Sequence, residues 1–178
     1  MEWVEETAAL AGGLVWGSFI NVCLDRWGIR FGGNEVRKRF LEDPTVSNEL
    51  KDHIRSGDLS PLNPVRSFCF ACGHQLLWHE LIPVISYLFS AGKCRTCGEA
   101  YGIRIMWVEL SHAAFFPAAV FWLGFTPEAL LICIDFSFLW LLGYSHSCPG
   151  LGAVLKTLGV LLLGGNGMFF SEFFLKIM

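Results

Sequence analysis

Four cysteines in two Cys-x-x-Cys pairs constrain the fold of this chain more than any other feature. The four are Cys69, Cys72, Cys94 and Cys97. Two thiolates three residues apart on a tight turn can bind one metal ion, and a second such pair completes a tetrahedral set of sulfurs. Gly73 and Gly98, directly after the two pairs, suit the left-handed turn of such a knuckle. The spacing predicts a structural zinc site in a zinc-ribbon-like loop; two disulfides or four buried free thiols are the alternatives.

Long, almost uncharged stretches on both sides of the cysteines indicate membrane-spanning helices. The chain of 178 residues is 53% hydrophobic, which is too apolar for an ordinary soluble domain. About 17–25 apolar residues cross a bilayer as a helix, and the stretches are 7–24, 106–124, 127–145 and 152–177. We therefore expect an all-α integral membrane protein with about four transmembrane helices.

The first stretch is expected to be a retained span, because glutamates precede it where a secretory signal would have basic residues. Gly13 and Gly17 lie four residues apart within it. They either let a second helix approach closely or reflect the general abundance of glycine in membrane helices.

Positive charge is concentrated in the segment that carries the cysteines. Eleven of the thirteen Lys and Arg residues lie between Arg26 and Arg104. Because basic loops stay in the cytoplasm, this segment is predicted to be cytoplasmic and the N-terminus to lie outside. The cytoplasm is reducing, which favours zinc thiolates over disulfides. Nothing in the sequence points to nucleic-acid binding, despite the basic loop.

Three regions are expected: a first transmembrane helix (1–25), a cytoplasmic loop domain with the zinc site (26–105) and a three-helix membrane region (106–178). Within the loop domain, Ser47 is a typical helix start, followed by a short helix over 49–54.

Three motifs make the chain similar to a known family. The first span ends G-S-F-I-N-V-C-L-D-R (17–26), the cysteine loop contains W-H-E-L-I-P-V-I-S (78–86), and the next span begins R-I-M-W-V-E-L (104–110). This resembles the N-terminal part of the type 4 prepilin peptidases, over roughly residues 14–116. The resemblance implies a multi-pass aspartyl peptidase of the bacterial cytoplasmic (inner) membrane that removes the leader of type IV prepilins. It also implies, for many members, N-methyltransferase activity with S-adenosylmethionine.

The family's two catalytic aspartates are not at the matching positions of this chain. His146 stands where the first would fall, and Ala153 stands in place of the aspartate of the family's G-x-G-D motif. Asp135 is a weak candidate, about 16 Å from the predicted cytoplasmic end of its helix. Paired carboxylates are needed because one holds a proton while the other activates water.

We therefore expect a shortened, catalytically inactive relative that serves as a structural or accessory subunit of a membrane complex. The alternatives are an active peptidase that pairs Asp135 with Glu109, a split enzyme whose missing half is another chain, and a redox or metal-sensing module. The expected partners are the lipid bilayer and other membrane subunits, with a prepilin substrate only if the protein is active.

The remaining histidines and cysteines are expected to play structural roles. His74 and His79 lie inside the metal loop as surface or outer groups, since four cysteines already suffice. His112, one helical turn from Glu109, is expected to hydrogen-bond to it. The cysteines outside the two pairs are expected to pack as small apolar side chains; they are Cys23, Cys133 and Cys148.

Overall fold

A computed structural model describes residues 2–145, and in this range the regular secondary structure is helical, with only isolated bridges in the loops. The elements in order are α1 (Glu2–Phe31), α2 (Gly33–Glu42), α3 (Asn48–Ser56), the 3₁₀ helix η1 (Trp78–Leu81), α4 (Ile85–Phe89), α5 (Arg104–Leu123) and α6 (Pro127–Ser145). The all-α fold class predicted from the sequence is confirmed. The predicted fourth span, 152–177, and the residues His146, Cys148 and Ala153 lie outside the described residues.

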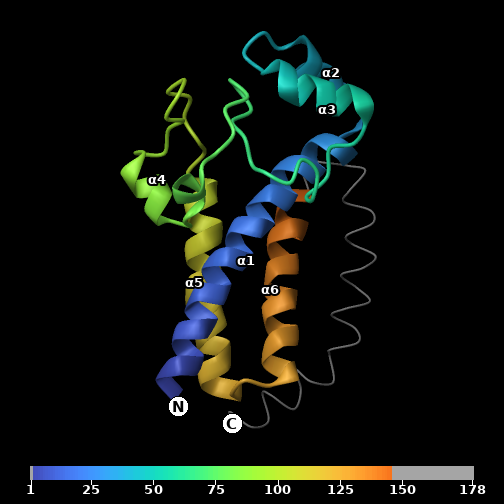
Figure 1. Cartoon of the computed structure of the whole chain (residues 1–178). Helices are drawn as coiled ribbons and strands as arrows, with labels where there is room; N and C mark the ends of the chain where they lie inside the picture. The colour runs from blue at the N-terminus through green and yellow to red at the C-terminus, as the bar shows by residue number, and fades with distance from the viewer. Residues whose placement is uncertain (1, 146–178) are drawn as a thin grey trace.

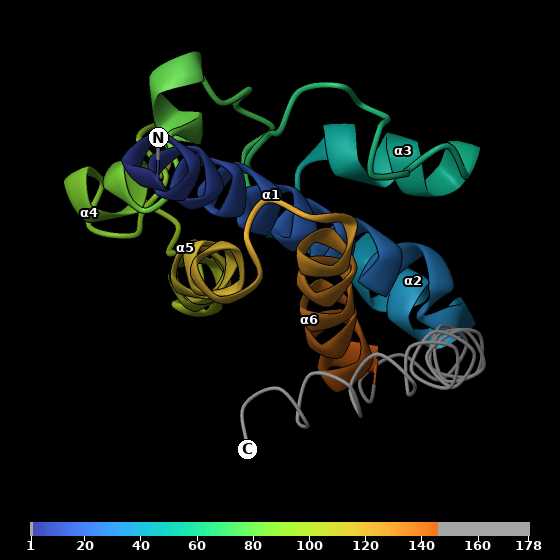
Figure 2. The ribbon, with the colours of Figure 1, turned by 90° about the horizontal axis from the view of Figure 1, so that it is seen from below.

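Three of the described helices, α1, α5 and α6, are long and apolar enough to cross a membrane. They stand side by side as a bundle, and the remaining helices gather at one end of it (Figures 1 and 2). This is the arrangement expected of a membrane protein in which each span satisfies its own backbone hydrogen bonds.

Glycines of α1 set its contact with α5. A methyl group built on Gly13 would lie 2.4 Å from the backbone oxygen of His112, and one built on Gly17 would lie 2.9 Å from the Cα of Glu109. The two backbones therefore touch where side chains are missing. Of the two interpretations of these glycines, close helix approach is the correct one.

Helix α1 is longer than the predicted span of 7–24 and continues to Phe31. The sequence suggested an end at Asp25 and Arg26 because charges usually close a span. Here both are partnered: Asp25 forms an ion pair with Arg104 at the start of α5, and Arg26 binds loop carbonyls. The helix thus continues past residue 25, where the first predicted region was expected to end. The division of the chain into three regions stays a prediction.

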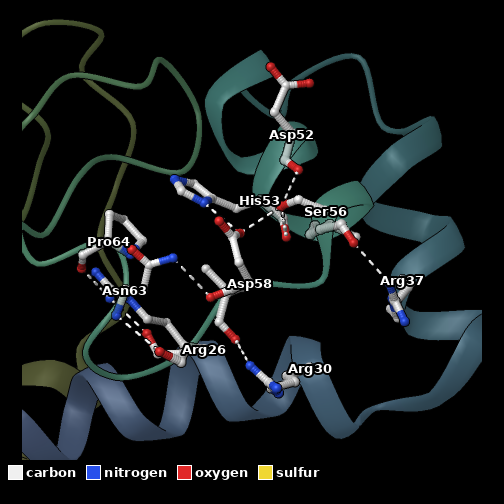
Figure 3. Close-up of polar contacts among 12 residues, drawn as sticks. Arg26, Arg30, Arg37, Asp52, His53, Ser56, Asp58, Asn63 and Pro64 are labelled. Carbon is white, nitrogen blue, oxygen red and sulfur yellow. Dashed lines mark hydrogen bonds and ion pairs between the residues drawn. The ribbon is translucent and has the colours of Figure 1, made fainter.

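Arg26 fastens the loop that follows α3 onto α1 (Figure 3). Its guanidinium donates to the carbonyl oxygens of Ser60, Pro64 and Arg66 at 2.9, 2.6 and 3.2 Å. The side chain is buried. A buried guanidinium requires such acceptors, because an unpaired buried charge is strongly destabilising.

Two hydrophobic clusters share α1. Within the membrane bundle, Ile20 and Leu24 pack with Val108 of α5 and Leu141 of α6. Beyond the bundle, the second cluster joins the end of α1 to α3 and the cysteine loop; it contains Ile29, Leu50, Ile54, Leu59 and Phe68.

The short helix predicted after Ser47 is α3. The hydroxyl oxygen of Ser47 accepts from the amide of Leu50 at 3.3 Å, so the serine caps the helix as the sequence predicted. The helix begins at Asn48 and ends at Ser56, slightly beyond the predicted range on both sides.

Candidate metal centre and adjoining cavity

The four predicted cysteines come together in one cluster. All four Sγ atoms lie within 4.8 Å of one another. Cys69 and Cys97 are 3.8 Å apart, as are Cys72 and Cys94, so each close pair joins the two knuckles. Sulfurs at about 2.3 Å from a tetrahedral zinc ion lie about 3.8 Å from each other, whereas a disulfide needs about 2.05 Å. The donor set and spacing therefore fit one tetrahedral metal ion.

The two knuckles have the same backbone structure. In each, the amide of the glycine donates to the carbonyl oxygen of the first cysteine at 2.9 Å, from Gly73 to Cys69 and from Gly98 to Cys94. Both glycines have a φ of +76°, as predicted from their place after each pair. The repeated Cys-x-x-Cys-Gly motif thus gives two equivalent turns, each of which presents two sulfurs to the shared centre.

Backbone amides favour a thiolate in the second knuckle. Burial raises the pKa of Cys94, but hydrogen bonds from the amides of Cys97 and Thr96 outweigh it and bring the value down to about 6. In the first knuckle, burial dominates and raises the pKa of Cys69 to about 12. A positive ion among the sulfurs is what would allow all four to ionise together.

His74 and His79 lie beside the cluster and are not part of it, as predicted. His74 Nε2 lies 3.2 Å from a carboxylate oxygen of Glu80, and His79 Nε2 lies 2.9 Å from the guanidinium of Arg95. The hydrogen bond from the amide of Leu77, together with His74, lowers the pKa of Glu80. These contacts tie the cysteine loop to η1.

A cavity of about 420 Å³ lies between the cysteine loop, α1 and the start of α5. Its polar lining includes Asn21 and Asp25 from α1, Tyr101 from the loop, and Arg104 and Glu109 from α5. Glu80 and Ser86 of the second motif also line it, so all three motifs that carried the family resemblance contribute to the cavity. Its volume suits a small molecule or a few side chains of a peptide.

Polar groups around this cavity are held by protein partners. Arg104 pairs with Asp25 and lies over the ring of Tyr144, with 5.1 Å from its Cζ to the ring centroid, so one side chain connects α1, α5 and α6. Asn21 Nδ2 donates to the carbonyl oxygen of Ile105 at 2.9 Å. These side chains fix the start of α5 against α1.

Glu109 connects the same region to the cysteine loop. Its carboxylate accepts from the amide of Val84 at 2.6 Å. The loop segment between the two knuckles is therefore attached directly to span α5.

The prediction of a hydrogen bond between His112 and Glu109 is wrong. His112 Nδ1 instead lies 2.7 Å from the carbonyl oxygen of Val108, and its Nε2 lies 3.2 Å from Ser137 Oγ on α6. Trp16 of α1 donates to the same hydroxyl group at 2.9 Å. His112 and Glu109 are one turn apart on α5, but each turns toward a different neighbouring element.

Asp135, the weak catalytic candidate, is buried on α6. Its suggested partner Glu109 is on α5, where the Val84 amide already holds its carboxylate. Cys23 and Cys133 are buried, as expected of small packing side chains. Within the part of the chain that the structure describes, the only cluster suited to a metal ion is the cysteine quartet.

Two structural residues had no role in the sequence predictions, although both lie within the quoted motifs. Arg26 ends the first motif and Arg104 begins the third. Their position at the ends of apolar spans was a usable signal, since an arginine at such a place either reaches the surface or binds buried acceptors.

Comparison with known proteins supports the resemblance. The sequence profile of the bacterial peptidase A24 N-terminal domain matches residues 11–123. The chain is 36% identical over 104 residues to the prepilin leader peptidase/N-methyltransferase of Myxococcus xanthus, covering 53% of this chain and 31% of that protein. The protein of the same name from Pseudomonas aeruginosa is 31% identical over 117 residues, covering 66% of this chain and 38% of that protein.

The similarity covers only part of these relatives. A third protein of that name, from Dichelobacter nodosus, is 38% identical over 104 residues and is covered over 35% of its length. The chain therefore spans about a third of the length of the curated relatives that it matches. No solved structure matches this chain.

Proposed function

Because the chain belongs to the bacterial peptidase A24 N-terminal domain family, we propose that it is a prepilin peptidase-like protein of the bacterial inner membrane that does not itself cleave peptides. It would serve as a structural or accessory subunit of a membrane complex, a pseudoenzyme that presents the zinc-bearing loop to its partners. The three apolar spans and the match to the family's N-terminal domain support the membrane and family parts of this proposal.

The cysteine quartet would hold a structural zinc ion through Cys69, Cys72, Cys94 and Cys97. The support is the set of four sulfur donors with 3.8 Å separations, since closed four-sulfur sites are typical of structural zinc. Such an ion would stabilise the fold by linking the two knuckles. It would not supply a catalytic water, because no coordination position is left open.

The loop that bears the zinc would face the cytoplasm, with the N-terminus outside. The Lys and Arg residues of the described part all lie between Arg26 and Arg104. This range begins near the end of α1 and closes at the start of α5, and it includes α2, α3 and the knuckles at one end of the bundle (Figure 1). The positive-inside rule supports this orientation.

The use of the carboxylates of Glu109 and Asp25 in structural contacts is the observation that carries the inactive assignment. An aspartyl peptidase needs two carboxylates that share one water molecule. Here Glu109 holds the Val84 amide and Asp25 pairs with Arg104. The sequence places His146 and Ala153 where the family has its catalytic aspartates. Glu109 and Asp25 thus have structural contacts of their own in the described part of the chain.

Leader cleavage in detergent tests this function. The purified chain, incubated with a type IV prepilin carrying its leader, is expected to release no leader, and the Asp135→Asn variant is expected to behave identically. Cleavage by the unaltered chain that disappears in the Asp135→Asn variant would establish an active peptidase and overturn the proposal.

A split peptidase is the second candidate, since a partner chain could supply the aspartates that the resemblance places at His146 and Ala153. In that case the chain alone is inactive, but leader cleavage appears when a copurifying membrane protein is added. Copurification without any gain of cleavage supports the accessory role instead.

A further inference from the structure

The segment 77–89, which contains η1 and α4, exposes large apolar side chains. Phe89 is 88% exposed, Trp78 is 78% exposed and Leu88 is 65% exposed. Three further apolar residues of the segment are also exposed: Leu77, Leu81 and Ile85. So much exposed apolar surface in one short segment marks a contact with a membrane or another protein.

Charge is almost absent from this segment. Residues 81–89 contain no Asp, Glu, Lys or Arg. The carboxylate of Glu80, just before them, lies 3.2 Å from His74 Nε2 and accepts a hydrogen bond from the amide of Leu77 at 2.8 Å. The segment can therefore enter an apolar environment without moving an unpaired charge out of water.

Glu109 fixes the depth of the segment relative to the bundle. Its carboxylate accepts from the Val84 amide at 2.6 Å, and it lies five residues after Arg104, the first residue of α5. Five residues of helix correspond to about 7.5 Å. Val84 is thus bonded to a residue between one and two helical turns inside the start of α5. If Arg104 marks the headgroup level, this corresponds to the roughly 5–10 Å at which interfacial helices lie in the headgroup and acyl boundary.

The backbone at Val84 adopts an uncommon conformation next to this hydrogen bond. Val84 has a φ of +61°, which is unfavourable for a β-branched residue. Such a conformation persists where surrounding contacts determine it. The hydrogen bond to the buried carboxylate of Glu109 is such a contact.

Exposed apolar side chains also stand at the start of α5, at the same end of the bundle as the segment. Ile103 and Trp107, at the start of that span, are 60% and 55% exposed. In Figure 1, α4 lies level with the start of α5, while the cysteine-bearing loops extend further from the bundle; Figure 2 shows α4 to one side of the bundle, away from α6. Tryptophan at this level is typical of a membrane–water interface.

We propose that segment 77–89 inserts into the headgroup and acyl boundary of the phospholipid bilayer, on the side of the cysteine loop, as an interfacial anchor beside α5. The bilayer, rather than a second copy or another protein, is the occupant we infer, because Glu109 ties the uncharged segment to α5 inside the start of that apolar span. The anchor would keep the four-cysteine centre at a fixed height above the lipid. This inference does not depend on whether the protein cleaves peptides.

Photo-crosslinking of the full chain in phosphatidylethanolamine and phosphatidylglycerol vesicles tests the anchor. The photoreactive residue p-benzoylphenylalanine replaces Phe89 in one protein, Phe121 of span α5 in a second and Asn48 of α3 in a third. Phe121 is 68% exposed on an apolar span, and Asn48 is exposed on a polar helix. All three positions tolerate a large aromatic side chain because they are at the surface.

Mass spectrometry is expected to find phospholipid adducts at position 89 with a yield similar to that at position 121 and several-fold above that at position 48. A yield at position 89 no higher than at position 48 would overturn the proposal. Adducts at position 89 to a second copy or to another protein, without lipid, would also overturn it and would make the segment a protein interface.

Discussion

At the scale of single residues, the packing of α1 against α5 depends on glycines, which have no side chain to keep the two backbones apart. Gly13 and Gly17 bring the backbones of α1 and α5 into contact. Gly12, their neighbour in the sequence, faces open space, and a methyl group added there would meet nothing within 4 Å. The same residue type is therefore indispensable at one position and replaceable at the next.

Replacing Gly13 with alanine is expected to destabilise the protein, because the added methyl group would lie 2.4 Å from the backbone oxygen of His112. Overpacking of this kind costs about 1–3 kcal/mol. Unfolding in detergent, followed by helical circular dichroism, measures the change. The matched control Gly12→Ala should be neutral or slightly stabilising, because alanine favours a helix by up to about 1 kcal/mol. Equal stabilities of the two variants would contradict the close contact.

The sequence predicted which residues cluster more readily than it predicted the hydrogen-bond partners of individual side chains. The spacing of Cys69, Cys72, Cys94 and Cys97 was sufficient because both knuckles are local turns that place their sulfurs by backbone geometry. The partners of Glu109 and His112 were not predictable, since they depend on which elements pack on each side of α5. A period of 3.6 residues places two side chains on nearby faces but does not say what meets them.

At the scale of the elements, α1 shows why span ends are hard to predict. The charges at Asp25 and Arg26 marked the end of the apolar stretch, yet the helix continues for five further residues to Phe31. Arg104 and the carbonyl oxygens of the loop over 60–66 satisfy those charges. Both partners are distant in the sequence, so a local pattern contains no sign of them.

The Arg26→Gln variant is expected to loosen the loop over 60–66, because it removes the guanidinium that binds Ser60, Pro64 and Arg66. A hydrogen bond to a charged group contributes about 1.5–3 kcal/mol, so amide exchange in this loop should accelerate by about ten-fold or more. The amides of Ser60 and Asn63, which bond across the loop, are the reporters.

The control for this experiment is Arg30→Gln. Arg30 lies one turn further along α1 and donates to the carbonyl oxygen of Leu59 at 2.8 Å. Its loss should change exchange in the same loop far less. Similar acceleration in both variants would show that Arg26 is not the main attachment.

At the scale of the whole described molecule, two hydrophobic clusters are joined by α1. One lies within the bundle of α1, α5 and α6, and the other lies between the end of α1, α3 and Phe68. Phe68 directly precedes Cys69, so the second cluster borders the cysteine quartet while the first does not. If the quartet holds the proposed zinc ion, loss of the ion should affect this end of the protein.

Metal removal tests this division. Purified protein is expected to contain about one zinc ion per chain, and chelation should accelerate amide exchange in both knuckles while the spans remain helical. Replacing Cys72 and Cys97 together with serine should abolish zinc binding. The control Cys133→Ser, a buried cysteine on α6, should retain it. Absence of metal from protein with intact thiols would contradict the zinc assignment.

The unbroken course of α1 has a mechanical consequence. With 30 residues it is a rod of about 45 Å, and a membrane-spanning helix can tilt to match the thickness of the bilayer. Tilts of membrane helices range over about 0–40°, so a change of about 10° would swing the far end by about 8 Å. Helix α1 is in this sense a lever, and a change in bilayer thickness would move α2 and α3 relative to the membrane surface.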